Sequence, residues 1–214
     1  MKTLQTLSLA LLSLPLSAQA WDLRLEAPFA KGQDLPGTTV QGSGQALSGS
    51  LDTGKGVILT ASHRIIRVGP VLKFEWNAEY AYLQADGRIQ QGQATDSHLR
   101  QSGPGVGINA QFWLPFTDFA GELGLLERFH AYRFEGASAS EDRSIARPWL
   151  RAGLRWVLPF PSPRPYLAAS YQAPLTRDKP AAEGSVQNLG AYLGAQGSGQ
   201  EFQSLWTLGV GISF

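Results

Sequence analysis

The last eleven residues of the chain read Ser204-Leu205-Trp206-Thr207-Leu208-Gly209-Val210-Gly211-Ile212-Ser213-Phe214. Counting back from Phe214, every second residue is apolar down to Trp206, and the residues between them are serine, glycine or threonine. This period of two is that of a β-strand with one apolar face. A strand that stays apolar to its last residue needs an apolar environment on one side and a partner strand to pair with. The wall of a membrane β-barrel supplies both.

This stretch resembles the terminal strand of bacterial outer-membrane β-barrels, which typically end in Phe with apolar residues at alternate preceding positions. The resemblance implies that the barrel-assembly machinery binds the C-terminal strand, with Phe214 as the assembly signal. Because the motif is short, it indicates a class and no particular family. The class is that of small barrels of the OmpA/OmpX membrane-domain type.

The first twenty residues have the three parts of a secretory signal peptide. Lys2 supplies the positive charge, residues 7–12 form a short apolar run, and Ala18-Gln19-Ala20 offers a cleavage site. We expect residues 1–20 to be removed during Sec-dependent export. Residues 21–214 then form a single barrel domain in the outer membrane of a Gram-negative cell envelope. No later segment has the roughly 18 apolar residues in a row that a transmembrane helix requires, so we expect the chain to cross the membrane as strands.

The composition argues against several kinds of function. The whole chain has 18 Lys and Arg against 17 Asp and Glu, so the part after the expected signal peptide is formally neutral. We therefore expect no nucleic acid as a partner. There is no cysteine, which excludes disulfides and thiol chemistry. His63, His98 and His130 are too scattered for a metal site, and we expect neither a metal nor a cofactor.

Segments at 21–27, 71–82, 105–114, 147–158 and 166–173 alternate apolar and polar residues in the same way. Two kinds of connection separate the strands in turn. We expect long loops at 30–56, 84–98, 135–145 and 176–200, and short turns at 69–70, 115–118 and 159–165. This order is typical of a barrel whose loops face outward from the cell and whose turns and termini face the periplasm.

The sequence therefore predicts an all-β fold, a closed antiparallel up-and-down transmembrane β-barrel of about eight strands. Ten strands is the alternative. Leu189, Tyr192 and Leu193 make the segment 187–195 too apolar for a plain loop. Together with the first long loop, this segment could supply another strand pair.

The polar faces of the predicted strands would point into the lumen. An eight-stranded barrel is just filled by its side chains, so we expect paired charges rather than an aqueous channel. A gated or leaky narrow pore is the alternative. The expected network consists of Asp22, Arg24, Glu26, Arg64, Lys73, Glu75, Glu79, Glu122, Arg128, His130, Arg151 and Arg155.

Aromatic residues on the apolar faces are expected to form girdles at the two membrane edges. One acidic residue, Glu127, shares the apolar face of its strand. We expect either a bulge at this point or a position near the outer rim, where a charge costs little. The expected girdle residues are Trp21, Trp76, Tyr80, Tyr82, Trp113, Trp156 and Trp206.

We expect no enzymatic activity, although one local cluster has suitable chemistry. Asp96-Ser97-His98 is similar to the acid, Ser and His of outer-membrane enzymes that move or remove acyl chains on lipid A. Neighbouring residues seldom adopt triad geometry. Residues 49–55 have the spacing of a phosphate-binding loop, but Gly56 stands where its Ser or Thr belongs.

The first function we consider is a structural or surface-interaction role, in which a stable barrel displays its loops to an extracellular partner. The pentapeptide Gln-Gly-Ser-Gly-Gln occurs at 41–45 and again at 196–200, in loops that the closing strands bring together. The second function is a narrow channel for small solutes, and the third is lipid A modification. We expect a monomer in contact with outer-membrane lipids.

Overall fold

The computed structural model describes residues 21–136, 140–176, 185–193 and 204–214, so the predicted signal peptide lies outside the described residues. None of the helical segments in these ranges has the length and hydropathy of a membrane span. The strands in these ranges are β1 (Trp21–Ala30), β2 (Gln33–Val40), β3 (Ala46–Leu51), β4 (Gly54–Val68), β5 (Leu72–Gln91), β6 (Gln93–Trp113), β7 (Phe119–Glu135), β8 (Ser140–Val157), β9 (Arg164–Pro174), β10 (Ser185–Val186) and β11 (Leu205–Ser213).

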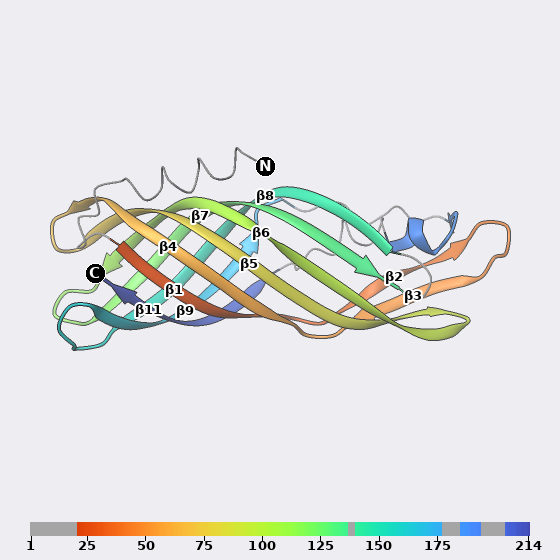
Figure 1. Cartoon of the computed structure of the whole chain (residues 1–214), viewed down its shortest axis with the longest axis horizontal. Helices are drawn as coiled ribbons and strands as arrows, with labels where there is room; N and C mark the ends of the chain where they lie inside the picture. Colours follow the sequence, from red (N-terminus) through yellow and green to blue (C-terminus); the bar gives the residue numbers. More distant parts are fainter. Residues whose placement is uncertain (1–20, 137–139, 177–184, 194–203) are drawn as a thin grey trace, which may run out of the picture.

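Eight of these strands form a closed ring (Figure 1). The order around it is β5-β4-β1-β11-β9-β8-β7-β6, and pairing of β6 with β5 closes it. Every pair in the ring is antiparallel. The predicted eight-stranded up-and-down barrel is confirmed. The ten-strand alternative is wrong, because β2, β3 and β10 lie outside the ring.

The first and last strands of the barrel pair with each other, as the apolar pattern of the C-terminal strand predicted. β1 and β11 pair from Asp22↔Ser213 to Ala30↔Leu205. At the end of this ladder the backbone N–H of Phe214 donates to the carbonyl of Trp21 at 2.9 Å. With this seam closed, no strand edge in the ring is left exposed to lipid.

The two ends of the barrel differ. The C-terminus and the short turns after β4, β6 and β8 share one end, the periplasmic end, whereas β2, β3 and β10 extend the opposite one (Figure 1). The predictions of loops at 30–56, 84–98 and 135–145 are wrong, because most of the described residues in these segments belong to strands. β5 and β6 are 20 and 21 residues long. Their hairpin therefore extends beyond the extracellular end of β4, which begins at Gly54.

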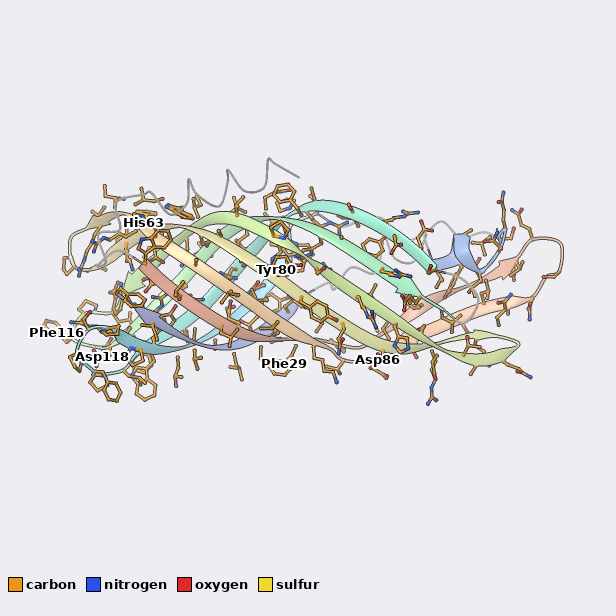
Figure 2. The ribbon with its side chains drawn as sticks, in the orientation of Figure 1. Phe29, His63, Tyr80, Asp86, Phe116 and Asp118 are labelled. Carbon is orange, nitrogen blue, oxygen red and sulfur yellow. The ribbon has the colours of Figure 1, made fainter. Side chains whose placement is uncertain are left out.

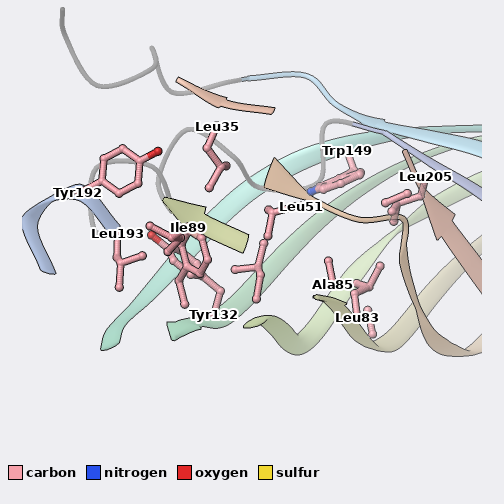
Figure 3. Close-up of a cluster of buried hydrophobic side chains, with 14 of the residues drawn as sticks. Leu35, Leu51, Leu83, Ala85, Ile89, Tyr132, Trp149, Tyr192, Leu193 and Leu205 are labelled. Carbon is pink, nitrogen blue, oxygen red and sulfur yellow. The ribbon is translucent and has the colours of Figure 1, made fainter. Parts of the chain in front are cut away.

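The outer wall is apolar, as lipid requires. Outward side chains on separate strands, such as Leu25, Leu59 and Val210, are 49%, 56% and 56% exposed. The inward side chains fall into two layers. Charged groups fill the periplasmic half of the lumen, and apolar groups fill the extracellular half (Figure 3).

Candidate functional site

The charged layer is organised around two glutamates, and the first is Glu122 on β7. Arg24 Nη2 donates to both of its carboxylate oxygens, at 2.7 and 2.8 Å, and Arg155 Nε donates to Oε1 at 2.7 Å. Arg155 Nη1 also donates to Asp22 at 3.1 Å. Strands β1, β7 and β8 are thereby joined across the lumen.

Toward the periplasm the same network ends at Lys73. Its ammonium lies 3.1 Å from an Asp22 oxygen and 2.5 Å from a Glu75 oxygen. The second oxygen of Glu75 accepts from Gln111 Nε2 at 2.5 Å. Both carboxylates are buried, so each needs a cation to offset the loss of hydration.

The second centre is Glu79 on β5. Arg128 Nε donates to one of its oxygens at 2.5 Å, and Arg151 Nη2 donates to the other at 2.7 Å. Arg151 also lies 3.4 Å from Glu26, and Arg24 lies 3.8 Å from the same carboxylate. Glu26 therefore connects the two centres into one network. This network places paired charges from β1, β5, β7 and β8 in the periplasmic half of the lumen.

Above the network the lumen becomes apolar, which sequence reasoning missed. Trp149 is fully buried, and the Arg128 guanidinium lies over its ring at 4.6 Å, so this pair marks the boundary between the two layers. His130 packs beside Trp149, with 6.5 Å between ring centroids, and its Nδ1 is hydrogen-bonded to Gln101. The buried apolar cluster beyond the boundary is Ala30, Leu35, Leu47, Leu51, Ile58, Ala81, Leu83, Ala85, Ile89, Leu99, Leu126, Tyr132, Phe134, Trp149, Leu189, Tyr192, Leu193 and Leu205.

The extracellular end continues as a sheet rather than as plain loops. β4 leaves β5 at Lys55↔Gln84, and β3 takes its place from Leu51↔Gly87 to Leu47↔Gln91. β2 pairs with β3, and β10 adds to β2 in parallel at Ser185↔Thr39. The first and last external segments therefore meet. The second Gln-Gly-Ser-Gly-Gln repeat, at 196–200, lies outside the described residues.

A helical turn at 189–193 packs at the extracellular end of the apolar cluster, on the left in Figure 3. Asn188 begins this turn, because its side-chain oxygen accepts from the Ala191 N–H at 2.9 Å, as an N-cap does. Leu193 and Tyr192 are fully buried. Burial raises the pKa of the Tyr192 hydroxyl to about 12. The apolar character that suggested an extra strand pair thus reflects a packed turn.

Ten of the twelve expected lumen residues are buried in the interior. Lys73 is half-buried at the periplasmic mouth but still joins the network. Arg64 is only half-buried and lines the periplasmic mouth beside a bulge in β4. Arg147 is 4% exposed and also faces inward, although it was not among the expected residues. Arg147 falls on the same face of β8 as Arg151 and Arg155, and this spacing would have identified it as a lumen residue.

Six of the seven expected girdle residues lie on the outer wall. At the periplasmic edge, Trp21 packs edge-on against Trp76 with ring centroids 5.5 Å apart. Nearer the other edge, Trp206 packs against Tyr171 at 5.0 Å. Trp113 departs from the expectation. It shares the inward parity of Gln111 and packs against the apolar group of Val157, Tyr166 and Ala168 at the periplasmic mouth. Glu127 is half-buried, on the outward-facing side of β7.

The candidate catalytic cluster is not assembled. Ser97 is fully buried, whereas Asp96 and His98 are exposed on the opposite face of β6. His98 Nδ1 is hydrogen-bonded to Asp86, across the β5–β6 pair, at 2.8 Å. Alternation along a strand thus separates Ser97 from both of its proposed partners. Among the described residues there is also no group of three or more His, Asp or Glu side chains that could hold a metal ion.

The fold has counterparts among solved structures, although no protein-family model and no curated protein matches the sequence. The structure of Ail, the attachment invasion locus protein of Yersinia pestis, aligns with a TM-score of 0.51 and 14% identity over 92% of this chain and 99% of Ail. Ail in complex with the heparin analogue sucrose octasulfate aligns with a TM-score of 0.50 and 15% identity over the same shares. The translocator domain of the autotransporter NalP from Neisseria meningitidis gives a TM-score of 0.43 at 11% identity, over 100% of this chain and 95% of that one. The alignment with Ail shows that this chain has the fold of a small outer-membrane β-barrel.

Proposed function

We propose that this chain is a monomeric outer-membrane barrel that acts by surface interaction, through the extracellular sheet formed by β2, β3, β10 and the ends of β5 to β8. The observation that carries this proposal is the docking of the β2–β3 hairpin on β5, which turns the first external connection into paired strands. A surface held by ladder hydrogen bonds presents fixed side chains to a partner and loses little entropy on binding. A long flexible loop would lose more.

The filled lumen supports this role over a channel. A solute would have to pass the apolar cluster and then the charged network, and each occupies the cross-section at a different depth. Lipid A modification has less support, because Ser97 and His98 lie on opposite faces of β6. Export by the predicted signal peptide and assembly through Phe214 belong to the same proposal.

The test compares cells that display the full chain with cells that display a variant lacking residues 33–51. Gly32 lies against Leu51 and Asp52, so a two-residue linker can join Gly32 to Asp52 without moving β1 or β4. Adherence to plates coated with extracellular matrix is measured with and without sucrose octasulfate, the compound seen bound to Ail. Heat-modifiable migration on a detergent gel checks that both chains are folded.

We expect the full chain to raise adherence and the variant to lose this gain while remaining heat-modifiable. Equal adherence of the two displayed chains would refute the proposal. Altered lipid A acylation, lost on Ser97→Ala, would then favour the enzyme.

A further inference from the structure

A cavity of about 740 Å³ opens at the periplasmic mouth of the barrel. Its floor is the periplasmic end of the charged network, where Lys73 and Arg155 line it. Trp113 forms part of an apolar wall, and Arg64, Arg67 and Arg164 stand around the opening. We call this cavity the periplasmic vestibule.

The charges of the vestibule do not balance. Lys73 and Arg155 are already paired with Asp22, Glu75 and Glu122 inside the lumen. By contrast, Arg64, Arg67 and Arg164 form no ion pair with any described residue, and Arg67 only donates to the carbonyl of Gly69 at 3.1 Å. Among the side chains that line the cavity, Asp118 is the one carboxylate. The C-terminal carboxylate of Phe214 also lies at the cavity. The three unpaired arginines outnumber these two carboxylates, so the opening carries an excess of positive charge.

The strand register brings two of these cations together. Arg67 of β4 lies directly opposite Lys73 of β5, so both side chains leave the sheet on the same face. Like charges in directly opposed positions repel each other. Lys73 is held by Asp22 and Glu75, so Arg67 is the member of this pair that lacks a counter-charge, and a bound anion would supply one.

We propose that the periplasmic vestibule binds a phosphate group, with Arg64, Arg67 and Arg164 as its hydrogen-bond donors. The planar guanidinium group donates two parallel hydrogen bonds to phosphate oxygens, and arginine keeps its charge at any physiological pH. The apolar wall beside Trp113 accommodates the uncharged part of a phosphate ester. The phosphate comes either from a solute in the periplasm or from the headgroup of an anionic phospholipid in the adjacent leaflet. This site is independent of the extracellular function proposed above.

The test is a calorimetric titration of the folded full-length barrel in a nonionic detergent that contains no phosphate. One arm titrates inorganic phosphate, and the other titrates phosphatidylglycerol, with phosphatidylcholine as its zwitterionic reference. The test variant is Arg64→Gln/Arg164→Gln. The control variant, Arg88→Gln/Arg100→Gln, removes the same charge from exposed residues on the extracellular strands. Heat-modifiable migration verifies that each variant is folded.

We expect saturable binding that weakens about tenfold or more in the test variant and stays unchanged in the control. Binding of inorganic phosphate identifies a periplasmic solute as the source, and binding of phosphatidylglycerol alone identifies the lipid. Equal affinities in the test and control variants, or no saturable binding of either probe, would overturn the proposal.

Discussion

Glu79 lies between Arg128 and Arg151, and each guanidinium donates to a different oxygen of its carboxylate, at 2.5 and 2.7 Å. One acidic side chain of β5 thus holds β7 and β8, which lie two and three strands away around the ring. Because Glu79 is 5% exposed, water cannot replace either contact. The pairing is a condition for keeping two arginines inside the barrel.

Replacing this acid, Glu79→Gln, keeps the size of the side chain and removes its charge. Both arginines then lack their common counter-charge, and breaking a buried ion pair in this way costs about 3–5 kcal/mol. We expect the urea midpoint of the barrel in lipid vesicles to fall accordingly. The matched control is Glu141→Gln, which breaks a surface pair with Arg143 and is expected to cost at most about 1 kcal/mol. Similar shifts for the two variants would show that the lumen network contributes no stability.

The seam between β9 and β11 offers a second prediction. Gly211 lies opposite Tyr166, and a methyl group on Gly211 would overlap the Tyr166 ring and come within 2.6 Å of the Leu23 carbonyl oxygen. A backbone atom cannot move aside as a flexible side chain can. We therefore expect Gly211→Ala to lower the free energy of unfolding by about 1–3 kcal/mol.

Gly121 provides the control for this substitution, because nothing lies within 4 Å of the position that its methyl group would occupy. Alanine is favoured over glycine inside a strand by about 0.5–1 kcal/mol. Gly121→Ala should therefore leave the urea midpoint unchanged or raise it slightly. A loss equal to that of Gly211→Ala would mean that any added methyl group harms assembly.

The period-two pattern was sufficient to predict the ring, because lipid outside and side-chain packing inside impose opposite demands on alternate residues. The same parity placed Glu79, Glu122 and Arg151 in the lumen. Partner choice within the network was not predictable, since it depends on which residues of separate strands reach the same depth. That depth is set by the register of all eight strands.

The extracellular half could not be predicted in the same way. β5 continues beyond the membrane with apolar residues on its inner face, such as Leu83, Ala85 and Ile89, and here polar residues outside indicate water rather than lipid. The segments 33–40 and 46–51 lack a clear alternation, and they become strands because the free edge of β5 is available for pairing. Propensity contributes less to their structure than the long-range ladder does.

Two successive layers of side chains in the lumen predict that the barrel does not conduct ions. The apolar cluster and the charged network lie one after the other along the lumen, so a hydrated ion would have to cross both. We expect no unitary current steps from the purified barrel in planar bilayers. Leu83→Ala removes side-chain volume from the apolar cluster and leaves the charged network intact. This variant should therefore also show no unitary current steps. Reproducible steps from the unmodified chain would support the channel function instead.

The buried hydroxyl of Tyr192 predicts a response to alkaline pH. Burial raises its pKa to about 12 in the folded chain, while in the unfolded chain the pKa is the ordinary tyrosine value of 10.0. Between these values the unfolded chain loses this proton and the folded chain keeps it, so the packing of the turn at 189–193 is lost as pH rises. A tyrosinate absorbance titration at 295 nm should show a component that ionises near pH 12, and Tyr192→Phe should reduce its amplitude by one tyrosine. An unchanged titration in the variant would place the Tyr192 hydroxyl in water.

The outer wall provides the most direct test of the membrane assignment. Val210 is the middle one of five outward residues from Trp206 to Phe214 and is 56% exposed, so it faces the centre of the lipid layer. An arginine at the bilayer midplane costs about 2–4 kcal/mol, and near the interface the cost falls to about 0–1 kcal/mol. We expect Val210→Arg to lower the free energy of unfolding in lipid vesicles by the larger amount.

The control is Phe116→Arg, at the tip of the turn between β6 and β7, where the side chain is fully exposed beyond the barrel (Figure 2). A positive charge there meets water and lipid headgroups, so the unfolding free energy should change little. The difference between the two variants measures the depth of Val210 in hydrocarbon. In a water-soluble barrel both arginines would be tolerated equally, because exposed charges cost nothing in water.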